Sequence, residues 1–157
     1  MNQKWFALFF IQKMKGVGKI ATTGIWKIEK RLDNVIDYTT NIEKTINSDY
    51  CKDSYYDLHN VIDYVEADYK TEKQFYVSGV NCNPKTALEE MTITKEQYGK
   101  TGGILGFHAF QSFAEGEVTP EQCHAIGVRL AEEMWGDRFE VVVSTHLNTN
   151  HYHNHFV

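Results

Sequence analysis

The fold of this chain follows from one stretch, Phe139-Glu-Val-Val-Val-Ser-Thr-His146-Leu-Asn-Thr-Asn-His151-Tyr-His153-Asn-His155-Phe-Val157. Residues 139–145 are rich in β-branched and aromatic side chains, which is typical of a buried strand. Residues 151–157 alternate between two faces, and their three histidines share one of them. The linker 147–150 is short and turn-prone, so we expect the two segments to form a β-hairpin.

Four of the seven histidines of the chain lie in this stretch, and they predict a metal site. Imidazole is the commonest metal ligand in proteins. The hairpin brings His146 across from the second strand, where His153 and His155 point the same way about 6.6 Å apart. His151 and His155 are about 13 Å apart, too far to share one ion. Spacing alone therefore leaves two triads open, because either His155 or His151 can complete the pair His146 and His153.

A purification tag or a solvated strand face accounts for the histidines less well. A tag would be a continuous homopolymer and would not follow a natural-looking strand. A solvated polar strand face is possible, but three histidines at period two opposite a fourth favour a divalent metal site.

Composition bounds the class of protein. The chain has 157 residues, 42% of them hydrophobic, enough for one globular domain with a core. The net charge of −5 counts against bulk nucleic-acid binding but leaves room for a local basic groove. Cys51, Cys82 and Cys123 are scattered, which predicts free thiols in a reducing cytosol. The apolar start is too short for a membrane span and lacks a small-residue cleavage site, so we interpret residues 1–19 as an N-terminal extension.

Periodicity predicts an alternating α/β chain. Strands are expected at 20–28, 75–80 and 104–113, and helices at 31–39, 55–67 and around 86–91. A further helix is predicted to start at Thr119 and Pro120, with Gln122 completing a capping box, and to stop at Gly136. It is expected to bury Cys123, Ile126, Leu130, Ala131 and Met134.

A short internal echo supplies two candidate nucleophiles. Asn-Val-Ile-Asp-Tyr occurs at 34–38 and again at 60–64, and each tyrosine lies off the apolar stripe of its helix. Taken alone, Tyr38 and Tyr64 are best explained as rim residues of amphipathic helices. Beside a metal that polarises a phosphoryl oxygen, a tyrosine suggests transesterification at phosphorus through a phosphotyrosyl intermediate. Hydrolysis would need only metal-bound water.

Three segments in series resemble the motifs of relaxases, the mobilisation nucleases of conjugative plasmids and transposons. Residues 22–45 resemble the first motif, residues 111–121 (Gln-Ser-Phe-Ala-Glu-Gly-Glu-Val-Thr-Pro-Glu) the second, and His146 with His153-Asn-His155 the third. The third is the paired-histidine signature of the wider HUH endonuclease superfamily. The resemblance covers roughly residues 20–157, which we take as a relaxase catalytic domain.

The resemblance implies a role for each matching residue. Tyr38 would be the nucleophile, with Tyr64 as runner-up, and would form a 5′-phosphotyrosyl link at a transfer origin. His146, His153 and His155 would hold Mg²⁺ or Mn²⁺, and His151 would support them or contact DNA. Ser112 would lie near the DNA backbone or the active tyrosine.

The sequence also departs from the family pattern. Many members carry Asp where this chain has Asn148, and an apolar residue where it has Asn154. The chain ends at Val157, inside the ligand-bearing strand, where relatives normally continue. We therefore expect a C-terminally truncated fragment whose activity is in doubt.

The implied fold is α/β, a mainly antiparallel central sheet flanked by helices, incomplete at its C-terminus. The expected DNA contacts are Lys27, Lys30, Arg31, Lys44 and Gln111. The implied partners are single-stranded transfer-origin DNA, a relaxosome accessory protein and a type IV secretion coupling protein, in the bacterial cytoplasm and without membrane insertion. The alternatives are a metal-dependent phosphodiester hydrolase and an inactive DNA-binding remnant.

Overall fold

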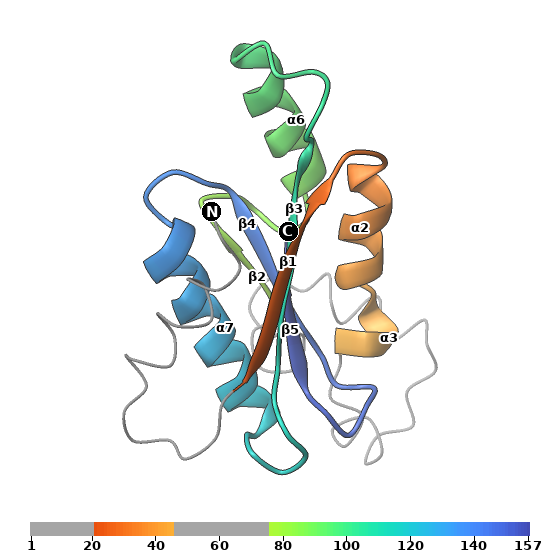
Figure 1. The fold of residues 1–157 in the computed structure, drawn as a ribbon, viewed down its shortest axis with the longest axis vertical. Helices are drawn as coiled ribbons and strands as arrows, with labels where there is room; N and C mark the ends of the chain where they lie inside the picture. The colour runs from red at the N-terminus through yellow and green to blue at the C-terminus, as the bar shows by residue number, and fades with distance from the viewer. Residues whose placement is uncertain (1–20, 46–75) are drawn as a thin grey trace.

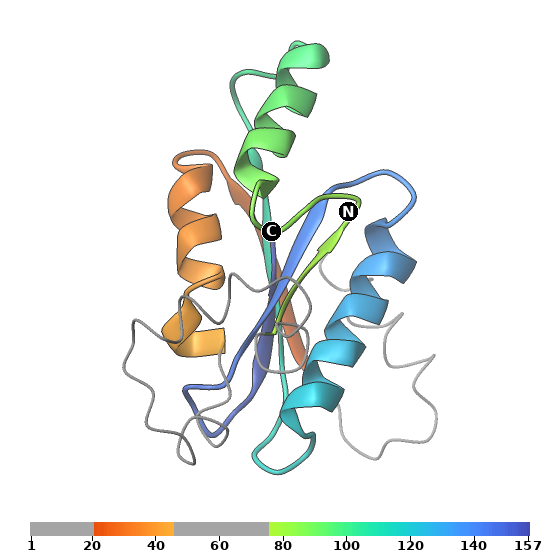
Figure 2. The same ribbon diagram turned by 180° about the vertical axis from the view of Figure 1, so that it is seen from behind.

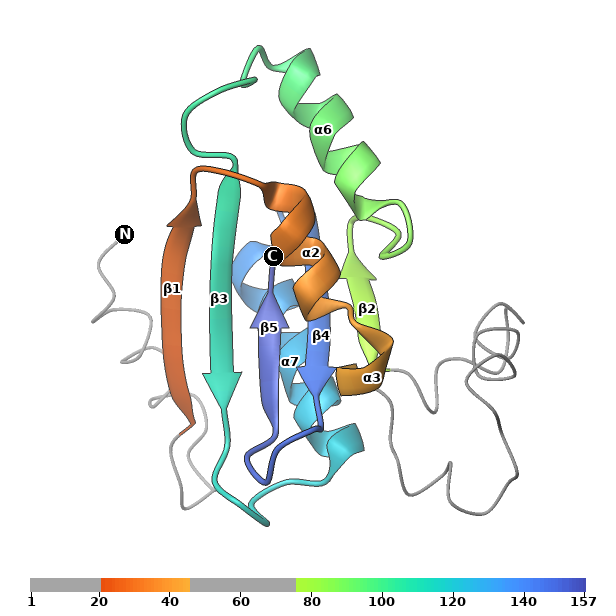
Figure 3. The ribbon, with the colours of Figure 1, turned by 90° about the vertical axis from the view of Figure 1, so that its right-hand side faces the viewer.

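A computed structural model of the protein describes residues 21–45 and 76–157. Five strands form one sheet in the order β1-β3-β5-β4-β2. Their bounds are β1 Thr22–Ile28, β2 Val77–Val80, β3 Gly106–Ser112, β4 Val141–His146 and β5 His153–Phe156. Every neighbouring pair is antiparallel. The sheet confirms the predicted fold class and the predicted hairpin, since β4 and β5 pair directly (Figure 3).

Helices cover both faces of the sheet, as the edge-on view shows (Figure 1). Helix α2 (Leu32–Thr39) and the short α3 (Ile42–Thr45) lie on one face, against β4. Helix α7 (Pro120–Trp135) packs on the other face, against β4, β2 and β5 (Figure 2). Helix α6 (Ala87–Gln97) extends past one end of the sheet. We call the two sides the α2 face and the α7 face.

Each face has its own apolar core. On the α2 face, Leu32 and Ile36 of helix α2 pack with Ile28, Val142 and other buried residues. Leu32, Ile36 and Thr39, the buried residues of α2, recur at the three- to four-residue spacing of one helix stripe. On the α7 face, the core is formed by Val80, Ala109, Leu130, Ala131, Val141, Val143 and Phe156. All six residues of β4 are buried because this strand lies between the two helical layers.

Helix α7 begins as predicted. The Thr119 side chain accepts from the Gln122 backbone N–H, and the Gln122 side chain accepts from the Thr119 backbone N–H. Of the expected buried residues, Cys123, Leu130 and Ala131 are buried, whereas Ile126 and Met134 are only partly so. Gly127 is buried in addition.

Several element bounds differ from the sequence predictions. Strand β2 is shorter than the expected 75–80, and helix α6 extends further than the helix expected around 86–91. Cys82 and Cys123 carry free thiols. The expected helix 55–67 with Tyr64, the thiol of Cys51 and the extension 1–19 lie outside the described residues. Among the described helices, no segment combines the length and apolar character needed to cross a membrane.

Candidate metal centre

Three histidines converge on the α2 face of the sheet. His146 ends β4 and lies directly opposite His153, which begins β5. His155 follows two residues later on the same face. One possible ligand nitrogen from each ring lies within 4.8 Å of the others, a spacing that could hold one metal ion.

Two of the rings have their orientation fixed by backbone carbonyls. His146 Nε2 lies 2.9 Å from the Thr39 carbonyl oxygen at the end of α2. His153 Nδ1 lies 2.9 Å from the His151 carbonyl oxygen. A carbonyl oxygen only accepts, so each of these ring nitrogens carries the hydrogen and donates it. The lone pairs of His146 Nδ1 and His153 Nε2 are thereby left for a metal, the arrangement typical of metal-bound histidines.

The third ring contacts a histidine that sequence analysis did not single out. His155 Nδ1 lies 2.8 Å from His108 Nε2, on strand β3. Within the described chain, His155 Nε2 is buried and has no hydrogen-bond partner. Buried polar atoms are nearly always paired, so an orphaned ring nitrogen beside two others fits the role of a metal ligand.

Burial keeps two of these imidazoles, those of His146 and His155, neutral. Burial, with smaller contributions from the neighbouring His146 and His153, lowers the pKa of His155 to about 2. Burial likewise lowers the pKa of His146 to about 4, against the opposing effect of its hydrogen bond to Thr39. A metal binds neutral imidazole, so neither ring has to lose a proton at neutral pH.

His151 stands apart from this group. It is exposed in the turn between β4 and β5, and its backbone carbonyl, not its ring, contacts His153. Of the two triads left open by spacing, the structure brings together His146, His153 and His155. Asn148, in the same turn, is also exposed.

Tyr38 lies over the histidines from the last turn of α2. Its ring centroid is 5.6 Å from that of His146 and 5.9 Å from that of His155. The side chain remains 51% exposed, so an outside ligand can reach it. Lys44 places its ammonium 3.4 Å from the centre of the same ring. The backbone holds this arrangement, because Leu147 N–H donates to the Lys44 carbonyl, which ties α3 to the end of β4.

Strand register adds Ser112 to the site. Ser112 on β3 lies directly opposite His153, as does His146 from the other side. Directly opposed residues of an antiparallel pair point to the same face. Ser112 therefore lies on the same face of the sheet as the three histidines.

Gln111 and Asn154 lie on the opposite, α7 face. Asn154, between the paired histidines, is fully buried and donates from Nδ2 to Gln111 Oε1 (3.0 Å) and the Cys123 carbonyl (2.8 Å). A Cβ on Gly127 would lie 2.5 Å from Asn154 Nδ2, so the glycine of α7 makes room for this amide. Gln111 is 0% exposed, so its side chain is not accessible to DNA, contrary to the expected role as a DNA contact.

The four predicted basic contacts are not clustered around Tyr38. Only Lys44 touches it. Arg31 lies at the far end of α2, where its guanidinium pairs with Asp33 at 2.8 Å. Lys27 and Lys30 are exposed, but Lys27 alternates with Trp26 and so faces away from the histidines.

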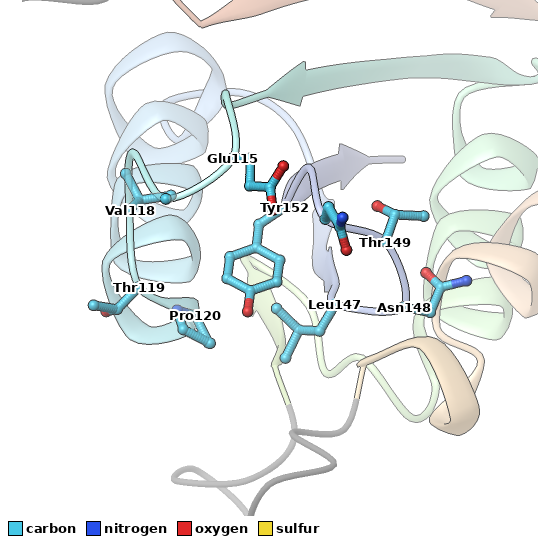
Figure 4. Close-up of a pocket in the computed structure, with 10 residues that line it drawn as sticks. Glu115, Val118, Thr119, Pro120, Leu147, Asn148, Thr149 and Tyr152 are labelled. Carbon is cyan, nitrogen blue, oxygen red and sulfur yellow. The ribbon is translucent and has the colours of Figure 1, made fainter.

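A separate pocket adjoins the hairpin turn (Figure 4). Two loops line it, the one before α7 and the one between β4 and β5, with the Tyr152 ring between them. None of the three histidines lines it. The three converging histidines therefore lie outside this pocket, on the α2 face.

Period-two alternation in β3 could have identified His108. Its side chain shares a face with Phe110 and Ser112, two and four residues later. The sequence gives no sign that His108 meets His155, because that contact depends on the pairing of β3 with β5.

Comparisons with known proteins agree with the motif resemblance. A family model described as “Relaxase: MobA/VirD2-like, nuclease domain” matches residues 64–157. A “Protein rlx” of Staphylococcus aureus is 45% identical over 80 residues, which cover 51% of this chain and 25% of that protein. The “Group II intron-interrupted relaxase LtrB” of Lactococcus lactis is 32% identical over 133 residues, 82% of this chain and 23% of that protein.

The chain spans about a quarter of the length of these curated relatives. No solved structure matches it. The family match includes strands β2 to β5, and thus all three converging histidines. The chain belongs to the MobA/VirD2-like relaxase family, whose nuclease domain matches its residues 64–157.

Proposed function

We propose that this chain nicks and rejoins one strand of DNA at a transfer origin through a 5′-phosphotyrosyl intermediate, and so initiates conjugative mobilisation. One observation carries the proposal. The exposed ring of Tyr38 lies within 6 Å, centroid to centroid, of two histidines whose free nitrogens converge on one point. A nucleophile beside a candidate Lewis-acid site is what phosphoryl transfer needs.

The proposed metal is divalent, Mg²⁺ or Mn²⁺. His146 Nδ1, His153 Nε2 and His155 Nε2 would hold it, because the other nitrogen of each ring is already engaged. When bound, the ion polarises a phosphoryl oxygen and stabilises the charge that develops on it. Imidazole nitrogen suits Mn²⁺ better than Mg²⁺, which prefers oxygen ligands, so we expect tighter binding of Mn²⁺.

The chain's own residues perform the transfer. The Tyr38 oxygen attacks phosphorus, and the bond from phosphorus to the 3′ oxygen breaks. The tyrosine hydroxyl loses its proton and the leaving 3′ oxygen gains one, which yields a phosphotyrosine and a free 3′-hydroxyl. Lys44, with its ammonium 3.4 Å from the ring centre, adds a positive charge beside the reacting groups.

Because one phosphoester replaces another, the step is readily reversed and the same site can rejoin the strand. Ser112, opposite His153, is suited to donate a hydrogen bond to the DNA backbone. We propose single-stranded transfer-origin DNA as substrate, and a relaxosome accessory protein and a type IV coupling protein as partners in the bacterial cytoplasm. These partners rest on family membership.

The test is adduct formation with labelled single-stranded transfer-origin DNA and Mn²⁺, followed on a denaturing gel. We expect a retarded covalent band that disappears in Tyr38→Phe and persists in Tyr64→Phe. The reverse pattern would contradict the choice of Tyr38. A metal-dependent hydrolase would cut DNA in Tyr38→Phe without an adduct, and an inactive remnant would give neither product.

A further inference from the structure

The α2 face is only partly covered. Helices α2 and α3 lie over β4 and β5, while β3 and the edge strand β1 face outward beside them (Figure 3). Trp26 of β1 lies on this outer part and is 51% exposed. Phe110 of β3 is its neighbour, with ring centroids 5.5 Å apart in an edge-to-face contact. Neither ring belongs to the two apolar cores.

The backbone accommodates these rings. Gly24 lies opposite Phe110 in the β1–β3 ladder. A Cβ there would lie 2.5 Å from the Phe110 ring and 3.0 Å from the Trp26 ring. Only glycine therefore lets both rings lie across the edge strand, where they form an aromatic surface made of the exposed Trp26 and the half-buried Phe110.

This aromatic surface is continuous with the metal centre. Phe110 lies directly opposite His155 in the β3–β5 ladder. Trp26 lies directly opposite His108, whose Nε2 is 2.8 Å from His155 Nδ1. Two strand spacings, about 10 Å, separate Trp26 from the ligand strand, so the rings border the place where a scissile phosphate would sit.

We propose that Trp26 and Phe110 form a stacking platform for the nucleobases of single-stranded DNA next to the scissile phosphate. This inference rests on the proposed function. Phosphate contacts alone give an acidic chain of net charge −5 little affinity. Base–aromatic stacking supplies binding that does not depend on net charge and tolerates any base sequence.

Sequence tolerance allows a test without the origin. The probe is oligothymidylate of about 12 nucleotides, within the usual length of a single-strand site. In the background Trp5→Phe/Trp135→Phe, Trp26 is the sole tryptophan of the chain. We expect the oligonucleotide to quench its fluorescence, and an abasic strand of the same length to leave it unchanged.

The affinity measurement uses matched variants of the full chain, with folding checked by circular dichroism. Trp26→Ala should weaken oligothymidylate binding by roughly 5- to 150-fold, the loss expected for one stack, and Trp26→Phe should restore most of it. The control is Phe107→Ala. Phe107 is 48% exposed on the same strand as Phe110 but faces the other side of the sheet, so its removal should leave the affinity unchanged.

The platform would be overturned by no binding or quenching with oligothymidylate, by equal quenching with the abasic strand, or by equal losses of affinity in Trp26→Ala and Phe107→Ala. An unchanged affinity in Trp26→Ala, as expected if a protein partner covers this face, would do the same. The assay needs neither metal nor Tyr38. Failure of the nicking proposal, seen as a missing adduct, is therefore a separate result.

Discussion

The two faces of the β4–β5 hairpin differ in whether their buried polar side chains are fully hydrogen-bonded. On the α7 face, Asn154 is tied to its neighbours by a run of hydrogen bonds. On the α2 face, one residue to either side, His153 and His155 bring ring nitrogens within 4.8 Å of each other, and among the described residues His155 Nε2 has no hydrogen-bond partner. The difference indicates that the α7 face is a structural scaffold and that the α2 face is suited to bind a metal ion.

The hydrogen-bond directions on the α7 face form a consistent sequence. Thr145 donates to Asn154 Oδ1 at 2.6 Å, so its hydroxyl oxygen must accept from His124 Nδ1 at 2.8 Å. His124 Nε2 then accepts from the Ser78 hydroxyl at 2.7 Å. A neutral His124 satisfies every bond, in agreement with its pKa, which burial lowers to about 4.

The largest expected effect is the loss of metal-dependent stabilisation when a histidine on the α2 face is replaced. His155→Leu removes one proposed ligand, so Mn²⁺ should no longer stabilise the fold. In the unchanged chain that stabilisation is roughly 4 kcal/mol at a Mn²⁺ concentration about 1,000 times Kd. Without metal, the variant should be about as stable as the parent, because removal of a buried nitrogen that has no partner among the described residues offsets the loss of the hydrogen bond to His108.

Urea unfolding with and without Mn²⁺ measures both quantities. His108→Phe is a graded companion, expected to weaken Mn²⁺ binding about 10-fold because it only removes the hydrogen bond that orients His155. A large loss of metal-free stability in His155→Leu would show that this face is structural as well.

The next largest expected effect is a loss of stability when the hydrogen-bond network of the α7 face is disrupted. Asn154→Leu leaves Gln111, Thr145 and the Cys123 carbonyl without their partner, which should cost about 3 kcal/mol of unfolding free energy. The loss should appear equally with and without metal in urea unfolding. Gly127→Ala is the matched change from α7 and should destabilise for the complementary reason, a methyl group pressed against Asn154. Stability unchanged in both variants would refute the scaffold role.

A third prediction uses pH. The pKa of His124 is about 4 in the fold and near 6.5 when the chain unfolds. Between these values the unfolded chain binds a proton that the folded chain does not, so the stability present above pH 6.5 falls as the pH drops. His124 alone should account for roughly 2 kcal/mol between pH 6.5 and 5.

His146 and His155, whose pKa values are also lowered by burial, act in the same direction. His124→Gln, which cannot titrate, should therefore flatten the pH dependence only in part. Replacement of the exposed His151 by Gln is the control. An identical pH profile in His124→Gln and the unchanged chain would contradict a buried, neutral His124.

Local patterns predicted much of this molecule. The hairpin, the helix over 31–39 and the capping box at Thr119 depend on residues close together in sequence, and the structure confirms each. The contact between His108 and His155 depends on which strands become neighbours, and no local pattern encodes that. The burial of Gln111 and the distance of Arg31 from the histidines also required the assembled sheet.

The smallest expected effect gives the most direct comparison of the two faces, because it contrasts substitutions at two adjacent residues of β3. Ser112 lies on the α2 face opposite His153, and Gln111 lies behind it on the α7 face. Ser112→Ala should slow adduct formation by about 5-fold, the value of one hydrogen bond near 1 kcal/mol, without changing stability. Gln111→Met should leave the adduct rate unchanged and change stability little, because it removes one acceptor of Asn154 together with a buried Nε2 that has no partner among the described residues. Asn154 also keeps its bond to the Cys123 carbonyl. If both substitutions slowed adduct formation equally, Gln111 would contribute to the reaction although it lies on the α7 face. That result would contradict the assignment of the reaction to the α2 face and of a purely structural role to the α7 face.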